Sequence, residues 1–420
     1  MIDRIIPGTS VKIVAGQRDT ELGVTGVVAM PLELNWGDKL THLRSGDDTF
    51  YTLGYKLTDE KLRLVNEVMK YADELYLYRI NKGEKATGTL VVGITVTAKY
   101  DGTRGNDITV VVKPAETKFI IKTIVGAVEV DSQTVETIAD FKSNDFVTIT
   151  GAGTLTEKTV KLTGGTNGTT QPITGFTSEI VKYDYNVLVY TGTDSATKTT
   201  LKDFVLEERA NSRNVQGVMS GVYADNKAIY NNTVGLIYPE YELTAEQSCA
   251  TMGGIIAKQG VNGSTTYFDV IGATDVNPRL TKLQQQDRTK KGEILFAYMY
   301  GGVKVLYDIN SLTTTNADNP KDFKKGLVVR TLDKYATDLQ ILLDTRAIGK
   351  IRNSVDGRNQ IKGMISDMTV KNYLDKGYIE GFTADDVTVS SGTERDSIIA
   401  NVGIKVADTV DKIYIEVTAL

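Results

Sequence analysis

The chain has 420 residues, 41% of them hydrophobic and 24% charged, which is ordinary globular composition with room for two to four domains. Its 48 basic and 53 acidic residues are interleaved and give a formal net charge of -5, which excludes the basic surface of a nucleic-acid-binding protein. One cysteine, Cys249, and one histidine, His42, exclude intrachain disulfides and a Cys/His zinc cluster.

The first part of the chain predicts a β-α-β unit. Residues 1–8 read as an extended arm, and residues 11–14 and 23–30 read as strands. A helix follows at Thr58, whose side chain can cap its first turn, and the later segment LYLYRI has the period of a strand. We assign residues 1–20 to an N-terminal arm and residues 21–89 to the N-terminal part of the core.

Residues 90–177 predict an inserted β-sandwich domain. Five short β-rich segments occur there, separated by Gly- and Thr-rich turns, with one short helix expected near residues 134–141. The segments are LVVGITVTA, ITVVVKP, FIIKTIV, FVTITG and KTVKLTGG. Short strands with frequent turn signals are typical of a small sandwich.

Residues 178–312 predict an α/β domain, because strand and helix patterns alternate there. Helices are expected over residues 196–211 and 244–258. The second has the capping-box pair Thr244 and Gln247, and Gly301-Gly302 predicts a two-residue hairpin turn further on. Alternation of this kind indicates a sheet that is at least partly parallel.

Residues 313–420 predict an α+β C-terminal domain that ends in a terminal strand. Two helices, over residues 331–347 and 356–375, precede three strand-like segments, DVTV, IIANVGIKVA and KIYIEVTA. Strands at a chain terminus leave backbone groups that commonly pair with another subunit's sheet. The candidate intersubunit residues are the apolar ones at the two ends of the chain: Ile2, Ile5, Ile6, Ile413, Ile415 and Val417.

No segment predicts catalysis. His42 lies in the loop-like stretch WGDKLTHLRSGDD, and no nucleophile elbow occurs elsewhere to complete a triad. Cys249 lies on the apolar side of a predicted helix, as a buried inert thiol does. The run LTGGTNGTT lacks the Lys-Ser/Thr pair of a phosphate-binding loop. We expect no catalytic residue, no metal and no cofactor.

The second C-terminal helix has an apolar stripe and a basic edge. Arg358 and Lys362 lie i,i+4 beside the stripe, and Lys350 and Arg352 precede the helix. The stripe consists of Ile361, Met364, Ile365 and Met368. The basic edge is either the solvated side of a core-facing helix or a surface that meets an acidic partner.

The N-terminal sequence MIDRIIPGTS has no basic segment followed by an apolar one, and no stretch approaches the ~20 apolar residues of a transmembrane helix. We therefore expect a protein that is made and kept in the cytosol, with neither nucleic acid nor membrane as a partner.

Five segments, in this order, resemble those of contractile tail sheath proteins, found in long-tailed phages of Gram-positive bacteria and in phage-derived R-type bacteriocins. They are TGVVAMPLELNWG, AKYDGTRGNDITVVV, ERANSRNVQGVMSG, NSVDGRNQIKGMISDMTVKNYLDKGYIEGF and KVADTVDKIYIEVTAL. The resemblance implies an α/β plus all-β chain: a subtilisin-like α/β domain, an inserted β-sandwich, and an α+β C-terminal domain joined by the N-terminal part. It implies no protease activity, because His42 lies far outside the α/β part.

The function that the resemblance implies is mechanical. Sheath subunits form six-fold layers that stack into a helical sheath around a tail tube, and the sheath contracts to drive the tube through a bacterial envelope. Terminal arms add strands to neighbouring subunits. The implied partners are further copies of the chain, the tube protein, and baseplate and terminator proteins of a phage tail or released bacteriocin particle. The basic helix would face the tube, so Lys350, Arg352, Arg358 and Lys362 are candidate tube contacts.

Two other classes stay open at this point. A secreted or surface adhesin or carbohydrate-binding protein would account for the Thr- and Tyr-rich strands, although it predicts an export signal that the sequence lacks. A hydrolase with a pair of carboxylates would need two acids that face one cleft.

Overall fold

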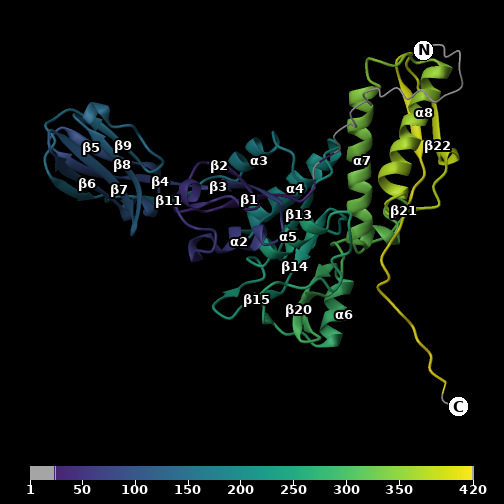
Figure 1. The fold of residues 1–420 in the computed structure, drawn as a ribbon. Helices are drawn as coiled ribbons and strands as arrows, with labels where there is room; N and C mark the ends of the chain where they lie inside the picture. The colour runs from purple at the N-terminus through teal and green to yellow at the C-terminus, as the bar shows by residue number, and fades with distance from the viewer. Residues whose placement is uncertain (1–22, 24, 419–420) are drawn as a thin grey trace, which may run out of the picture.

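The computed structural model describes residue 23 and residues 25–418 (Figure 1). A β-sandwich forms one end of an elongated molecule, a mixed α/β domain forms the middle, and a helical C-terminal domain forms the other end. The predicted arm residues Ile2, Ile5 and Ile6, and the strand expected over residues 11–14, lie outside the described residues.

A seven-stranded sheet forms the middle of the molecule, in the order β18-β14-β13-β12-β1-β3-β2. Neighbouring strands from β18 to β3 pair in parallel, and the edge strand β2 pairs with β3 in the antiparallel direction. The strands are β1 (Val27–Leu32), β2 (Leu40–Arg44), β3 (Glu74–Arg79), β12 (Val187–Val189), β13 (Gln216–Met219), β14 (Ile229–Asn232) and β18 (Glu293–Ile294). The expected α/β architecture is therefore present.

The described N-terminal part contacts two domains. Gly23 N donates to Asp338 Oδ1 of the C-terminal domain at 3.0 Å, whereas β1, β2 and β3 are members of the central sheet. The reason for this sheet membership is local: β1 has the sequence VVAMPL and is almost wholly buried, and such a strand is stable only between two others. It pairs with β3 on one side and β12 on the other.

Helices cover both faces of the central sheet, as a parallel sheet requires. Alternate strand residues face opposite sides: Val28 packs with α2 (Arg63–Met69) and α5 (Cys249–Gln259), whereas Ala29 packs with α3 (Thr174–Ile180) and α4 (Ser195–Ala210). A short 3-10 turn, η1 (Glu60–Leu62), precedes α2. The expected helix over residues 196–211 is therefore α4.

The helix expected from residue 244 begins five residues later in the structure. The predicted reciprocal bonds do form, because Gln247 N donates to Thr244 Oγ1 at 3.3 Å and Thr244 N donates to Gln247 Oε1 at 3.1 Å. They stabilise a turn that leads into α5, which starts at Cys249.

Smaller elements cover the lower edge of the central domain in Figure 1. They are the three-stranded sheet of β15 (Gly235–Ile237), β16 (Glu242–Leu243) and β17 (Asp275–Asn277), the helix α6 (Lys282–Lys290), and the hairpin of β19 (Phe296–Met299) and β20 (Gly302–Val305). The turn residues of this hairpin are Tyr300 and Gly301, not the predicted Gly301-Gly302. Met299 pairs with Gly302, and the two residues between them have φ of 52° and 82°, as this turn type requires.

The sandwich consists of two four-stranded sheets, ordered β10-β6-β7-β8 and β11-β4-β5-β9. Its strands are β4 (Asn81–Val91), β5 (Ile94–Asp101), β6 (Ile108–Ala115), β7 (Lys118–Val125), β8 (Val128–Val135), β9 (Val147–Gly151), β10 (Lys158–Lys161) and β11 (Thr166–Thr170). The sandwich strands therefore run from residue 81 to residue 170, compared with the predicted range of 90–177. The short helix expected near residues 134–141 is only the 3-10 turn η3 (Ile138–Asp140), because β8 continues to Val135.

The sandwich packs closely against the N-terminal part of the core. Trp36 is fully buried in the sandwich cluster, where its ring lies 5.2 Å from that of Tyr100 and 5.8 Å from that of Phe146. Phe50 of α1 (Phe50–Leu53) belongs to the same cluster. Arg79 also donates to both carboxylate oxygens of Asp101, at 3.1 Å each. The domain boundary is therefore crossed by apolar and ionic contacts.

We expect the central domain to keep a cooperative unfolding transition when residues 81–170 are replaced by a short Gly/Ser linker, but to self-associate through the newly exposed Trp36 and Phe50. Adding Trp36→Ser and Phe50→Ser to the same variant should restore a monomer. Thermal unfolding and sedimentation velocity measure the two effects. Loss of cooperative unfolding in both variants would show that the sandwich belongs to the central folding unit.

The C-terminal domain consists of two packed helices and two small sheets. Its elements are α7 (Gly326–Arg346), α8 (Val355–Thr369), the π-helical turn η5 (Val370–Leu374), β21 (Ile379–Glu380), β22 (Val387–Ser391), β23 (Ile398–Val402) and β24 (Lys405–Val406). The helix expected over 331–347 begins earlier, at Gly326, and the one expected over 356–375 is α8 continued by η5. The third expected strand, KIYIEVTA, forms no strand within residues 411–418 of the structure.

Candidate assembly surfaces

His42 and Cys249, the residues considered above for nucleophilic chemistry, are both engaged in contacts that stabilise the fold. His42 lies on strand β2, not in a loop as predicted; its Nε2 is 2.6 Å from Glu74 Oε2 and its ring stacks on Tyr76 with centroids 4.3 Å apart. Cys249 is buried in the central core, and that burial raises the pKa of its thiol.

A hydrolase with a pair of carboxylates would need buried acids in one cleft, and the buried acids of the described chain include Glu67, Glu208, Glu293, Asp308 and Asp338. Glu67 of α2 is fully buried. Its oxygens accept from Tyr238 and Tyr241 at 2.7 Å each, from Thr251 at 2.8 Å and from Lys70 at 2.5 Å. Both oxygens are thus occupied by contacts that hold α2 against α5 and the β15–β16 connection. The network gives Glu67 a packing role.

Among the described residues, no three or more His, Cys, Asp or Glu side chains gather where they could hold a metal ion. Over the same part of the chain, no helix combines the length and apolar character needed to cross a membrane.

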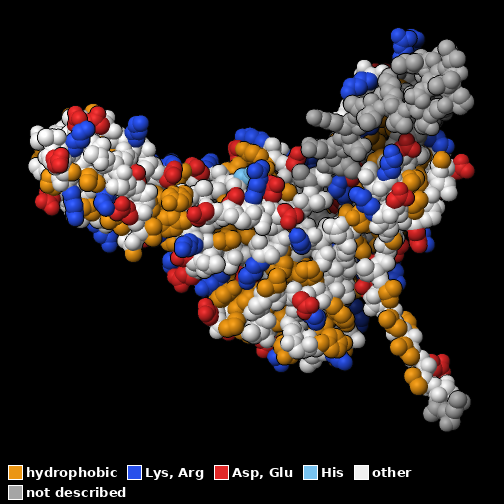
Figure 2. Space-filling view, viewed as in Figure 1, with side chains coloured by type: hydrophobic (Ala, Val, Ile, Leu, Met, Phe, Trp, Pro, Cys, Tyr) orange, Lys and Arg blue, Asp and Glu red, His pale blue; other side chains and the backbone are white. Residues whose placement is uncertain are grey.

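The C-terminal tail, which we define as residues 407–418, leaves the fold after β24 (Figure 1). Ala407 N still donates to Tyr378 O at 3.0 Å, but further along Ile413 is 75% exposed, Ile415 79% and Val417 87%. Figure 2 shows apolar side chains along this projecting segment. Exposed apolar side chains on an extended backbone are unfavourable in water and are stabilised by pairing with another sheet.

The terminal hairpin, which we define as β22 and β23, offers such a sheet. The two strands pair with each other from Val387–Val402 to Ser391–Ile398, and neither has a second partner in the described part of the chain. Val387 is fully buried and β22 packs on α8, whereas Ile399 on the other face is 50% exposed. The hairpin therefore presents open strand edges over an already formed core.

The candidate tube-contact residues occupy one end of the C-terminal domain. Lys350 and Arg352 are exposed in the connection from α7 to α8, and Lys350 donates to Thr345 O. Arg358 and Lys362 are half-buried on α8, whose residues Ile361, Ile365 and Met368 face the domain core.

Asn353 is a residue of this surface that the sequence did not indicate. Arg358 Nη1 donates to Asn353 Oδ1 at 2.8 Å, and Asn353 Nδ2 donates to the carbonyls of Arg395 and Ser397 at 3.0 and 2.9 Å. Asn353 thereby connects the basic end of α8 to the turn of the terminal hairpin. No local pattern could have predicted this, since the partners are more than 40 residues apart in the chain.

Helix α7 carries the C-terminal domain and is fixed to the central domain by buried charge. Arg330 donates to Asp308 at 3.0 and 2.8 Å and to the carbonyls of Gly260 and Gly263. Burial alone raises the pKa of Asp308, but the Arg330 guanidinium and the hydrogen bond from Thr265 N hold that pKa below its ordinary value.

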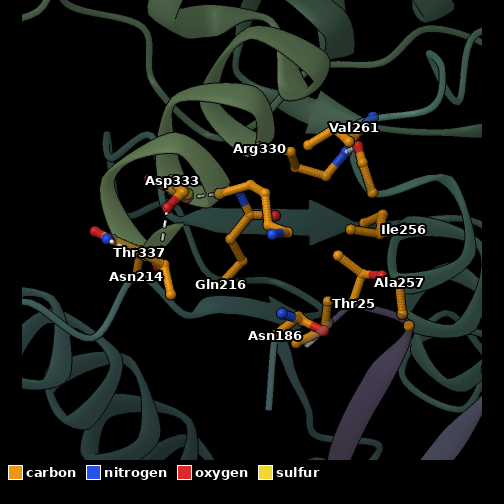
Figure 3. A pocket seen from close by; sticks show the side chains of 14 residues that line it. Thr25, Asn186, Asn214, Gln216, Ile256, Ala257, Val261, Arg330, Asp333 and Thr337 are labelled. Carbon is orange, nitrogen blue, oxygen red and sulfur yellow. Dashed lines mark hydrogen bonds between the residues drawn. The ribbon is translucent and has the colours of Figure 1, made fainter. Parts of the chain in front are cut away.

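The neighbouring turn of α7 carries a second ion pair. Asp333 accepts from Arg209 at 2.8 and 2.7 Å and from Gln216 at 3.2 Å. Figure 3 shows Arg330, Asp333 and Gln216 around a small cavity of about 60 Å³ between α7 and the central sheet. A cavity of this size at the base of a helix is a packing gap between two ion pairs, not a ligand site.

The first residue of α7 must be glycine for this arrangement. A Cβ on Gly326 would overlap Asp308 Oδ1 and crowd Arg330, so the start of the helix can approach the buried pair only without a side chain. Gly326 N itself donates to Asp308 O at 3.1 Å.

Comparison with protein families gives four consecutive matches along the chain. Residues 25–80 match the domain III N-terminal region of the tail sheath protein Gp18, and residues 81–167 match the phage tail sheath protein beta-sandwich domain. Residues 166–311 match the phage tail sheath protein central domain, and residues 318–419 match the phage tail sheath C-terminal domain.

Individual proteins match over nearly the whole chain. A sheath tail protein of Desulfitobacterium hafniense has 35% identity and a TM-score of 0.86, over 97% of this chain and 99% of that one. A sheath tail protein of Listeria innocua has 28% identity and a TM-score of 0.82, over 94% and 95%. Protein XkdK of the phage-like element PBSX of Bacillus subtilis is 31% identical over 96% of this chain and 94% of that protein.

A more distant likeness concerns the fold alone. The sheath of the anti-feeding prophage, solved as a helical sheath in the contracted state, has 13% identity and a TM-score of 0.61 over 98% of this chain and 99% of that one.

Proposed function

The chain belongs to the phage tail sheath protein family, and from this premise we propose that it is the repeating subunit of a contractile sheath. In this proposal, hexameric layers stack helically around a tail tube and shorten to drive the tube through a bacterial envelope. The observation that carries the proposal is that one chain has both an exposed apolar tail and a terminal hairpin with open strand edges.

Tail and terminal hairpin together make a head-to-tail contact. The tail of one copy adds to the terminal hairpin of the next, whose own tail is free to continue the series, so the contact can generate rings or helices. Ile413, Ile415 and Val417 would place one face of the added strand on the acceptor sheet. Ile2, Ile5 and Ile6 are proposed as anchors of a second added strand from the N-terminal arm, on the sequence pattern alone.

Connections within the sheath would be stronger than contacts with the tube. An added strand forms ~5 backbone hydrogen bonds at about 1 kcal/mol net each, whereas exposed ion pairs contribute ~0 to 1 kcal/mol each. Lys350, Arg352, Arg358 and Lys362 would therefore hold the tube with contacts that can be released while the strands keep neighbouring subunits connected. A lattice that rearranges without dissolving needs this order of strengths.

The rest of the proposal follows from the family and from the sequence. The subunit has no enzymatic role and needs no cofactor; any likeness of its central domain to subtilisin is one of architecture, with His42 on the edge strand β2. Assembly takes place in the bacterial cytoplasm, with baseplate and terminator proteins at the two ends of the sheath.

Electron microscopy of the purified protein tests the proposal. We expect hollow tubes or stacked rings at high protein concentration. Monomers or compact dimers as the sole species under all conditions would reject a sheath subunit.

Charge reversal on α8, Arg358→Glu with Lys362→Glu, is expected to reduce the fraction of sheaths that contain a tube and to leave sheath formation intact. Exposed charge contacts are screened by salt, so tube occupancy of the unmodified sheath should also fall as ionic strength rises. The matched control is Lys158→Glu with Lys161→Glu, two exposed lysines on sandwich strand β10. Equal tube occupancy in micrographs of both double variants would move the tube contact to another surface.

A further inference from the structure

The root of the C-terminal tail is held by a buried lysine. Lys325 lies immediately before α7, and its Nζ contacts the carboxylate of Asp411 and lies 3.6 Å from that of Asp408. The side chains of Lys325 and Asp411 are only 10% and 11% exposed. We refer to Lys325, Asp408 and Asp411 as the Lys325 cluster.

Lys325 is held in place by contacts of both its side chain and its backbone. Its Nζ lies 4.8 Å from the centroid of the Tyr307 ring, and its backbone N donates to Asp322 O at 3.0 Å. The next residue, Gly326, is the one that meets the buried pair of Asp308 and Arg330. The Lys325 cluster therefore joins the tail to the start of α7, where the helix is attached to the central domain.

The cluster marks a boundary within the tail. Before it, Ala407 bonds to Tyr378, and Asp411 is nearly buried; after it, Tyr414 is 90% exposed and Ile415 79%. A chain held at Asp411 can explore only the reach of residues 412–418. A chain held only at Ala407 explores the reach of residues 408–418, so the effective concentration of its tip at a fixed point falls roughly twofold, with the 3/2 power of tether length.

We propose that Lys325 is a positioning residue for assembly: by binding Asp408 and Asp411 it fixes the point and direction from which the tail reaches a neighbouring copy. This inference rests on the proposed function, since it assigns a determinant to the same tail contact. Its physical effect is on the effective concentration of the tail at the neighbour's terminal hairpin, and the tail's own contacts with that hairpin are unchanged.

The test compares Lys325→Met with Lys325→Arg, which keeps the charge, and with Lys321→Met. Lys321 is an exposed lysine that lines the same surface cavity as Lys325, Asp408 and Asp411. We expect Lys325→Met to raise the protein concentration needed for tube or ring formation about twofold or more, and the two other variants to stay near wild type. If Lys325→Met does not fold, Asp408→Asn with Asp411→Asn removes the same contacts from the tail side, outside the folded core.

A second readout separates positioning from general stability. Tyr414→Cys creates a labelling site on the tail, because the native Cys249 is buried. A spin label there should become more mobile in monomers when Lys325→Met or the double Asp variant is added, and stay unchanged with Lys321→Met. Unchanged label mobility together with wild-type assembly in the Lys325→Met or double Asp variant would overturn the inference.

The outcome also distinguishes this inference from the proposed function. If a chain that ends at Asp411 still assembles, the tail contact itself is absent and both proposals about the tail fail. If that truncation abolishes assembly but the Lys325 and Asp variants assemble at wild-type concentrations, only the role of Lys325 is rejected.

Discussion

A chain that ends at Asp411 is expected to fold like the full-length protein and to form no tubes or rings. The exposure of the removed residues Ile413, Tyr414, Ile415 and Val417 ranges from 75% to 90%, so their loss uncovers no core, and the unfolding free energy should change by less than about 0.5 kcal/mol. Far-UV circular dichroism and thermal unfolding test the fold, and sedimentation velocity tests assembly. Large particles formed by the truncated chain would contradict exchange of the tail.

A pair of face-specific variants serves as the control for this truncation. Because side chains of a strand alternate between two faces, Ile413, Ile415 and Val417 should face the acceptor sheet together. Changing these three to Ser should prevent assembly, whereas Tyr414→Ser with Glu416→Ser and Thr418→Ser should be tolerated. Equal effects of the two triple variants would indicate that the tail does not bind as a strand.

Arg330→Met is expected to destabilise the protein by about 3 to 5 kcal/mol, because it leaves the carboxylate of Asp308 buried without its partner. The free energy of unfolding in urea measures the effect. Adding Asp308→Asn should recover part of the loss, since the amide removes the unpaired charge and its oxygen can still accept from Thr265 N.

The ion pair also predicts a pH dependence. The pKa of Asp308 is lowered in the folded protein. The ionised carboxylate therefore contributes fully to the free energy of unfolding above the unfolded pKa of about 4, and this contribution is lost as the pH falls through the folded pKa. The stability difference between the unmodified protein and Arg330→Met should therefore narrow in acid. A difference that stays constant from pH 7 to pH 3, or a loss below 1 kcal/mol at pH 7, would show that the pair does not hold α7.

Periodicity in the sequence predicted the parts of the fold that depend on local pattern. The apolar stripe of Ile361, Ile365 and Met368 does face the C-terminal core, and the helix expected over residues 196–211 is present as α4 (Ser195–Ala210). The prediction is wrong where the secondary structure of a segment depends on contact with another segment. The segment KIYIEVTA alternates like a strand, but a strand also needs a neighbour, and none lies beside residues 412–418 within the described part of the chain.

The contacts that attach α7 and the tail could not be predicted from local patterns. Arg330 and Asp308 are 22 residues apart, and Lys325 and Asp411 are 86 apart, with no spacing rule that relates them. The hairpin turn at Tyr300 and Gly301 was displaced by one residue because Gly-Gly satisfies the same turn chemistry as Tyr-Gly, and only the strand register decides between them.

The central claim is that the tail of one copy pairs with the terminal hairpin of another. Cryo-electron microscopy of assembled particles at side-chain resolution tests it most directly. The account predicts a hollow tube of six-fold layers in which density for residues 412–418 continues from one subunit into the sheet of β22 and β23 of a neighbour. Density in which the tail folds back onto the terminal hairpin of its own subunit, or subunits joined without any added strand, would contradict it.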